Sequence, residues 1–173
     1  MLSADVLGWS RVARYVPVSA ENGDLQFRSE VGAPTRYFVR RRGSDRFELT
    51  QSFDGDAEQL LLFVAEVAVL GQYLVGLFAD DIREDLDLPF LELRYTAADL
   101  AAGYRLSEMV RGYRTLTQSD GRPVAAAPDP VLSLLALVPL SHLLGWPVAD
   151  LKRSFLSPSG APLIRNGRYA VRR

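Results

Sequence analysis

Apolar and polar residues alternate over three short stretches in the first third of the chain. These stretches are residues 25–29, 35–42 and 46–52. A period of two is typical of a half-buried strand, so Tyr37 and Val39 are expected on one face of the second stretch. The turn-forming sequence Gly43-Ser44-Asp45 predicts a hairpin after it. The pattern therefore predicts an antiparallel meander.

A second group of alternating stretches follows after residue 100. Residues 104–110, 112–118 and 122–126 have strand-like composition, and Ser119-Asp120-Gly121 is a typical turn between the last two. Together with the first group they predict an antiparallel sheet of five to seven strands.

The longest apolar run, residues 60–78, predicts a long central helix. Asp54 or Asp56 can cap a helix over residues 54–78, and Glu58 lies in its first turn, where the helix dipole favours negative charge. The run is long enough to raise the question of a membrane span. Glu66 and Gln72 within it, and the acidic flanks, argue against a membrane, so we expect a helix buried on the sheet.

Shorter helices are expected at both ends of the chain. Asp5 can cap a helix over residues 5–15 that ends before Pro17, and Thr96 can cap a helical turn over residues 96–100. Residues 131–144, begun by Asp129-Pro130, and residues 148–156 predict a C-terminal helical pair, kinked or broken at Pro139. The basic tail, residues 165–173, is expected to fray.

These elements predict an α+β fold with an antiparallel sheet packed on a long central helix and a C-terminal helical pair. At 173 residues, one domain over residues 1–173 is expected. The N-terminus has no basic segment followed by an apolar run, which argues against a signal peptide. The absence of cysteine is compatible with a reducing compartment but does not by itself establish one.

The composition offers few groups for catalysis. The chain has no cysteine and one histidine, His142, which excludes thiolate nucleophiles and multi-histidine metal sites. His142 follows Ser141, but no G-x-S-x-G elbow or glycine-rich nucleotide loop is present. We therefore expect a binding protein without a cofactor rather than an enzyme.

Charge is unevenly distributed along the chain, although the net charge is only −1. Residues 1–44 carry a net charge of +3, residues 45–99 of −10 and residues 100–173 of +6. The acidic segment contains the run from Asp80 to Asp87. Such a run is compatible with a solvated helix end, with paired catalytic or metal-binding carboxylates, or with a surface that faces a partner protein.

Two basic segments suggest other partners. The first is a predicted hairpin that carries Arg36, Arg40, Arg42 and Arg46. These arginines either bind phosphate or are solvated charges that protect a hairpin tip and an edge strand. Residues 140–156 scan like a helix-turn-helix, with Gly145 in the turn and Lys152-Arg153 on the second helix. A DNA-binding regulator that uses this segment is the alternative hypothesis, although Asp150 on the same helix argues against it.

Three groups of residues together carry a resemblance to a known family. The first is Arg36-Tyr37-Phe38-Val39, and the second is residues 72–78 followed by Ile82-Arg83 and Leu88-Pro89. The third combines residues 140–144, 148–156 and 159–163. In order and spacing they resemble the polymorphic-toxin immunity family that includes the immunity factor of the tuberculosis necrotizing toxin. The resemblance extends over nearly the whole chain and is weakest in the N-terminal 30 residues.

The resemblance implies an immunity protein, or antitoxin, that stays in the cytosol of the producing cell. Such proteins form a tight 1:1 complex with a toxin domain that hydrolyses NAD and block its NAD-binding cleft. The resemblance does not identify the contact residues. It implies neither a nucleic-acid nor a membrane partner.

Charge suggests which surface would bind such a toxin. A cleft that holds the pyrophosphate of NAD tends to be basic, so we expect the acidic run to bind it. The residues of this predicted surface are Asp80, Asp81, Arg83, Glu84, Asp85 and Asp87. The rival toxin-binding surface is the hairpin that carries Arg36, Arg40, Arg42 and Arg46.

Overall fold

The computed structural model describes residues 1–30, 32 and 34–172, and its largest element is an antiparallel sheet. The strand order is β1-β2-β3-β4-β5-β8-β7-β6. In chain order the strands are β1 (Tyr15–Ser19), β2 (Leu25–Ser29), β3 (Thr35–Arg41), β4 (Phe47–Phe53), β5 (Gln59–Val64), β6 (Tyr104–Leu106), β7 (Tyr113–Gln118) and β8 (Pro123–Pro128). Its eight strands exceed the five to seven predicted from the sequence.

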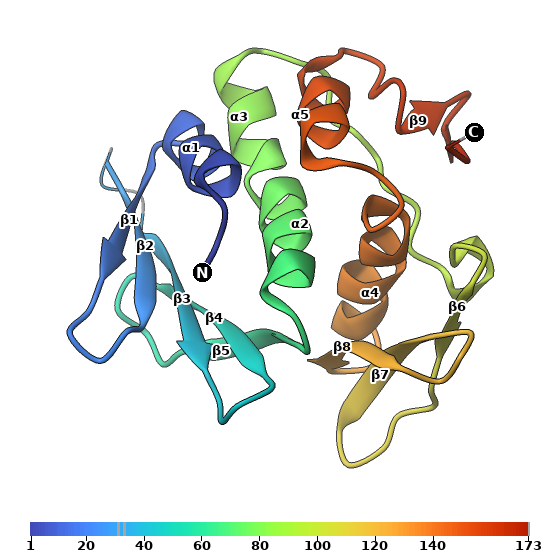
Figure 1. Ribbon diagram of the computed structural model, residues 1–173. Coiled ribbons are helices and arrows are strands. Elements are labelled where there is room, and N and C mark those ends of the chain that lie inside the picture. The colour runs from blue at the N-terminus through green and yellow to red at the C-terminus, as the bar shows by residue number, and fades with distance from the viewer. Residues whose placement is uncertain (31, 33, 173) are drawn as a thin grey trace.

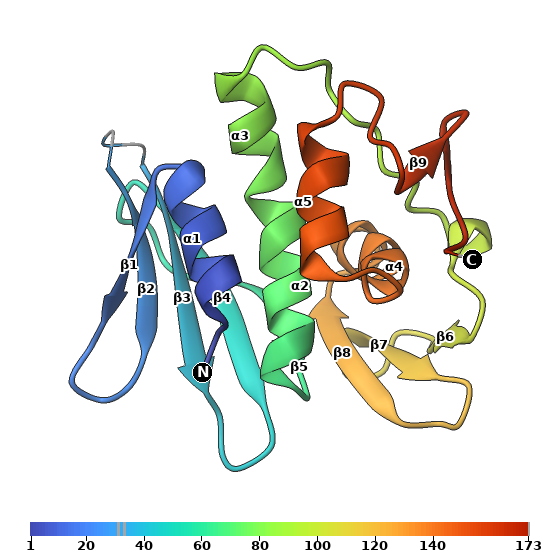
Figure 2. The ribbon, with the colours of Figure 1, turned by 45° about the horizontal axis from the view of Figure 1, so that its top comes forward.

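The helices lie on the concave side of this sheet, which curves around them (Figures 1 and 2). They are α1 (Ala4–Val12), α2 (Val67–Leu77), α3 (Ala79–Asp85), the 3-10 turn η1 (Ala97–Asp99), α4 (Leu132–Leu143) and α5 (Val148–Leu156). The α+β prediction is confirmed. Thr96 and Asp99 form a capping box at η1, as the sequence suggested for Thr96.

The prediction of a long central helix over residues 54–78 is wrong. The first part of the apolar run forms β5, and only the second part forms α2, an 11-residue helix that is followed directly by α3. In β5, Leu62 and Val64 are buried, and Phe63 is partly buried. A strand that is apolar at successive positions has the same apolar pattern as a buried helix, so periodicity alone cannot separate the two.

The N-terminal helix is shorter than predicted because the chain turns at Arg14. Arg14 has φ 61°, which ends α1, and the next residues form β1 at the edge of the sheet. The prediction of a helix through Tyr15 is therefore wrong. Ser3, not Asp5, is the N-cap, and its hydroxyl accepts the backbone N–H of Val6.

The core centres on Phe78, the residue between α2 and α3. Its ring contacts those of Tyr15, Phe27 and Tyr37, with centroids 5.2, 5.2 and 5.8 Å away. These three aromatic residues come from β1, β2 and β3, so Phe78 joins the helices to one half of the sheet. The indole of Trp9 donates a hydrogen bond to the Val75 carbonyl (2.9 Å) and fixes α1 to α2.

The predicted C-terminal helical pair is present as α4 and α5. Pro139 lies inside α4 without ending it, and Asp129 accepts the backbone N–H groups of Val131 and Leu132 at its start. Within the described residues no helix taken singly has the length and apolar character of a membrane span. The pair α4 and α5 meets that test only jointly, across a 113° bend.

Residues 164–170 of the C-terminal tail are held by specific contacts, contrary to the prediction that residues 165–173 fray; residue 173 lies outside the described residues. β9 (Ile164–Arg165) and β10 (Arg168–Tyr169) pair as a small hairpin. The Tyr169 ring stacks on His142 with centroids 3.6 Å apart, and its hydroxyl donates to the Arg94 carbonyl. These contacts are between residues far apart in the sequence, so local composition did not reveal them.

Replacing Gly160 by alanine is expected to lower the free energy of unfolding by about 2 kcal/mol. Gly160 has φ +74°, and an added Cβ would lie 2.6 Å from Leu91 Cδ1 and 3.2 Å from Ile164 Cβ. Urea denaturation measures the loss. Gly121→Ala is the matched control: φ is +88° but nothing lies within 4 Å, so only backbone strain of about 1 kcal/mol is expected. Equal losses would contradict a packing role for Gly160.

Candidate functional site

The acidic run of the sequence forms α3 and the turn after it, at the end of the helical layer far from β5 (Figure 2). Asp80 and Asp81 lie in the first turn of the helix. Asp80 is exposed, and Asp81 is half-buried; the remaining exposed acids are Glu84, Asp85 and Asp87. Asp85 forms an ion pair with Arg14 (2.8 Å). The structure thus gathers the predicted carboxylates at one end of the molecule.

Two of these carboxyl groups are electrostatically strained. Although Asp80 is exposed at its surface, the protein atoms around it exclude part of the water from its carboxyl group, which raises its pKa, and the nearby Arg83 guanidinium only partly opposes this. Burial also raises the pKa of Asp81, and the charges of Asp80, Glu84 and Asp85 add to the effect. A raised pKa means that ionisation of these two groups disfavours the folded state.

Arg83 does not belong to the surface that was predicted for it. Its side chain is buried, with 2% exposure. The guanidinium donates hydrogen bonds to the backbone carbonyls of Phe155 (2.7 Å), Ser157 (2.8 Å) and Pro158 (3.0 Å), and to that of Pro89. It therefore links α3 to the end of α5 and to the segment after α3, where no partner protein can reach it.

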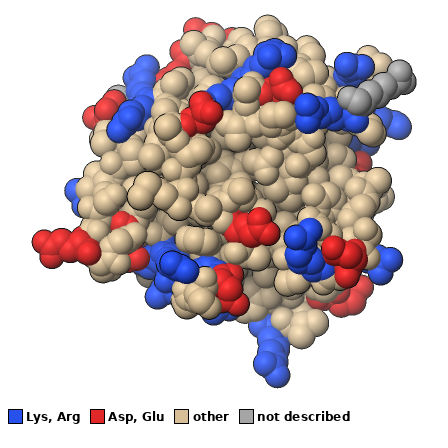
Figure 3. All heavy atoms as spheres, in the orientation of Figure 1, with Lys and Arg blue, Asp and Glu red and all other residues tan. Residues whose placement is uncertain are grey.

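Two of the four arginines predicted on the hairpin, Arg40 and Arg42, are paired with acids. Arg40 forms a bidentate ion pair with Glu58 (Nη2–Oε1 2.8 Å) and lies 3.4 Å from Asp24. Arg42 pairs with Glu48 (2.7 Å). Arg40 and Arg42, from the basic residues 1–44, are thus paired with Glu58 and Glu48, from the acidic residues 45–99, which offsets part of the charge of both segments. Figure 3 accordingly shows acidic and basic side chains side by side around the rim of one face.

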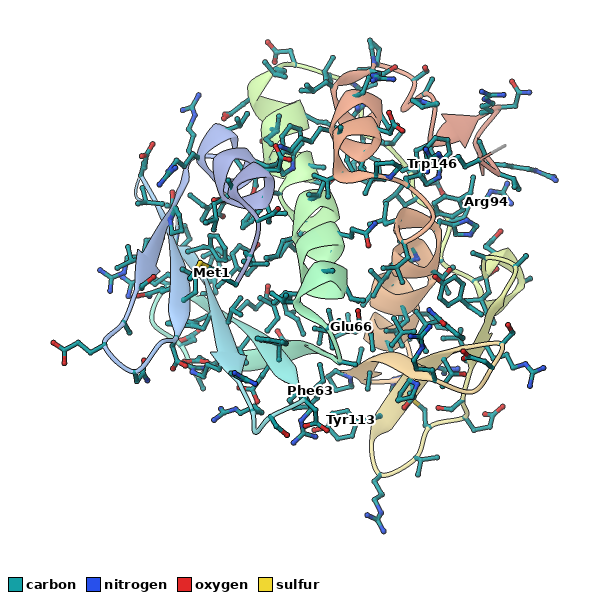
Figure 4. The ribbon with its side chains drawn as sticks, viewed as in Figure 1. Met1, Phe63, Glu66, Arg94, Tyr113 and Trp146 are labelled. Atoms are coloured by element: carbon teal, nitrogen blue, oxygen red, sulfur yellow. The ribbon has the colours of Figure 1, made fainter. Side chains whose placement is uncertain are left out.

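The remaining arginines of the hairpin, Arg36 and Arg46, are exposed. The Arg46 guanidinium lies over the ring of Phe63, 4.9 Å from its centroid. Phe63 in turn lies beside Tyr113 of β7, with centroids 6.0 Å apart (Figure 4). The hairpin surface is therefore a mixed aromatic and ion-paired surface, and its rival role in toxin binding stays a prediction.

Ser141 and His142 do not form a catalytic pair. The Ser141 hydroxyl donates to the Val138 carbonyl (2.6 Å) and accepts the Ala101 N–H. The His142 Nε2 atom bonds to the Asp99 carbonyl (2.7 Å). Burial lowers the pKa of His142, so the imidazole is neutral at pH 7. Both side chains hold η1 and its flanks against α4.

The side chains of the helix-turn-helix-like segment, residues 140–156, make contacts within the protein. Leu151 and Phe155 of α5 are buried. Lys152, one of the two predicted DNA contacts, donates to the Asp5 carbonyl (2.7 Å), and the other, Arg153, pairs with Asp150 (3.3 Å). Both basic side chains therefore have intramolecular partners.

A metal site at the acidic run is not favoured. Among the residues that the structure describes, no three of the ligand-forming acids or His142 lie close enough together to hold an ion.

A groove beside α3 was not predicted from the sequence. It is about 440 Å³ in volume and lies between α2, α4 and the segment of residues 88–95. Asp80 is the residue that it shares with the predicted acidic surface. The available signal was the alternation in Phe90-Leu91-Glu92-Leu93, in which Leu91 is buried while Phe90 and Glu92 are exposed.

Comparisons with known proteins give a consistent result. A family model described as Immunity protein 61 matches residues 9–163. The "Immunity factor for TNT" of Mycobacterium tuberculosis and the "Immunity factor for TNT homolog" of Mycobacterium bovis are each 29% identical to this chain over 168 residues, which cover 94% of this chain and 92% of theirs. The solved structure "Rv3902c from M. tuberculosis" superposes with a TM-score of 0.82 at 27% identity, over 94% of this chain and 92% of that one.

Proposed function

Because the chain belongs to the Immunity protein 61 family, we propose that it is an immunity protein that binds and inhibits a cognate NAD-hydrolysing toxin and catalyses no reaction itself. The observation that carries this proposal is the family match over residues 9–163, together with two relatives named as immunity factors for TNT. The toxin would be bound in a 1:1 complex, with the NAD-binding cleft blocked.

The geometry of α3 supports the manner of inhibition. The carboxylates of α3 and of the turn after it extend from the end of the helical layer. Of these five residues, only Asp85 has an ion-pair partner within the described residues; the others are Asp80, Asp81, Glu84 and Asp87. A cleft that binds the pyrophosphate of NAD needs basic side chains and backbone N–H groups. An acidic helix of this kind complements such a cleft and speeds association through long-range attraction.

The proposal is tested by mixing the purified protein with the NAD-hydrolysing toxin encoded beside its gene and following NAD loss. Hydrolysis should fall linearly with added protein and stop at one equivalent, because a tight 1:1 inhibitor titrates the enzyme. An NAD glycohydrolase of unrelated fold is the control and should stay fully active, which separates toxin inhibition from NAD sequestration. Unchanged hydrolysis, with no complex by size-exclusion chromatography, would refute the proposal for this toxin.

A further inference from the structure

The groove beside α3 has an apolar floor and is open to solvent. Leu140 and Leu143 of α4 form part of its lining and are 0% and 2% exposed. Gly76 of α2 also lines it, and an ideal Cβ at Gly76 would come within 2.9 Å of Leu143, so the two helices approach closely there. The floor is therefore built from core residues and is held rigidly.

Two carboxylates from different elements line this groove. Asp80 comes from α3, and Glu92 comes from the segment that follows it. Neither side chain has a hydrogen bond or ion pair with any residue that the structure describes. The Arg83 guanidinium is near enough to lower the pKa of Asp80 but donates its hydrogen bonds to four backbone carbonyls instead of to that carboxylate. The groove thus presents two carboxylates without a direct ion-pair partner among the described residues, next to apolar surface, and the Arg83 guanidinium offsets the charge of Asp80 only in part.

Aromatic side chains complete the lining. Tyr73, Phe90 and Tyr95 all contribute to it, and Phe90 is 81% exposed. The segment that carries Phe90 is not loose, because Arg83 holds the Pro89 carbonyl and Leu91 packs on Gly160. A large apolar side chain that an anchored segment exposes to solvent marks a surface that gains free energy when a partner covers it.

We propose that this groove receives a basic side chain, an arginine or lysine, from the toxin. The aliphatic stem of that side chain would pack on the leucine floor, and its charge would lie beside the carboxylates of Asp80 and Glu92. Exposed aromatic rings favour a cation over their faces as well. The source of the basic residue rests on the proposed function; the preference of the groove for a cation with an apolar stem does not.

The acidic residues at this end of the molecule would then have two different roles in toxin binding. The carboxylates of Glu84 and Asp87 attract a basic partner from a distance, whereas Asp80 and Glu92 bind one side chain in a partly apolar setting. Charge pairs that lose water in this way affect the dissociation rate more than the association rate.

The first test compares toxin binding by the double variant Asp80→Asn/Glu92→Gln with that by wild type. We expect affinity at least about tenfold weaker, mainly through faster dissociation in surface plasmon resonance. Glu21→Gln/Glu108→Gln is the matched control, since it removes two exposed carboxylates elsewhere and should bind normally. Phe90→Ala should also weaken binding, whereas Phe53→Ala, at another exposed phenylalanine, should not.

The second test needs no toxin. A short acetylated peptide with one arginine, and the same peptide with citrulline, are titrated into the labelled protein and followed by NMR. Saturable shifts of residues 73–95 with arginine alone, lost in Asp80→Asn/Glu92→Gln, are expected at millimolar peptide. Identical shifts with both peptides would overturn the cation preference.

The two tests separate the possible failures. If wild type binds the toxin and Asp80→Asn/Glu92→Gln binds it with the same affinity, the groove does not receive a basic side chain of the toxin. The proposed immunity function would then still stand. If wild type binds no toxin, the proposed function fails, and the peptide titration alone decides whether the groove binds a basic side chain.

Discussion

Arg83→Met is expected to lower the free energy of unfolding by about 3 kcal/mol. Methionine keeps much of the buried stem but removes every donor from the carbonyls of Phe155, Ser157, Pro158 and Pro89. Carbonyls that lose a charged donor in a buried setting lose more than an ordinary hydrogen bond contributes. Urea denaturation followed by circular dichroism measures the change.

Two further arginine variants test whether the buried hydrogen bonds of Arg83 cause this loss of stability. Arg83→Lys should recover only part of the stability, because three donors on a point charge cannot serve four carbonyls in the planar arrangement of a guanidinium. Arg14→Met removes an exposed arginine and its ion pair with Asp85, and should cost less than about 1 kcal/mol. Arg83→Met as mild as Arg14→Met would show that the buried hydrogen bonds contribute little.

Neutralising the α3 carboxylates is expected to weaken toxin binding about 100-fold at low salt. The variant carries Asp80→Asn, Asp81→Asn, Glu84→Gln and Asp85→Asn. Its affinity should also depend much less on ionic strength, since the long-range attraction that salt screens is gone. Isothermal titration calorimetry at two salt concentrations measures both effects.

Loss of folding should not explain this result. The pKa values of Asp80 and Asp81 are raised in the folded protein, so their charged forms disfavour folding and neutral amides in their place should leave stability unchanged or slightly higher. Thermal unfolding of the variant checks this point. Binding that stays at the wild-type level in a folded variant would remove α3 from the interface.

A separate variant tests whether the toxin binds to the arginine-bearing hairpin instead. Arg36→Gln/Arg42→Gln/Arg46→Gln removes three of the predicted arginines but keeps Arg40, whose ion pairs connect β3 to the residues just before β2 and β5. If the acidic surface binds the toxin, this variant binds at least as well as wild type. Weaker binding only in the arginine variant would instead place the interface on the outer face of the sheet.

Local signals in the sequence were sufficient for a large part of the fold. Residues 25–29 form β2 and residues 148–156 form α5, as predicted. The turn at Gly43-Ser44-Asp45 and the cap at Thr96 are also where the sequence placed them. In each case the signal is carried by residues within one turn or one strand, so tertiary packing had no competing preference to impose.

By itself, then, the sequence determined the α+β class, most of the hairpins, the C-terminal helical pair and the resemblance to an immunity family. The tertiary structure alone decided that residues 59–64 form a strand, because a fully apolar segment fits either a strand or a helix until its neighbours are in place. It also decided which charges remain free. Arg83 lies in an acidic run but is buried against α5, and Arg40 pairs with Glu58 just before β5, whereas Asp80 and Glu92 form no ion pair with any residue that the structure describes. Pairing between charges depends on distances in space, and residues far apart in the chain set those distances.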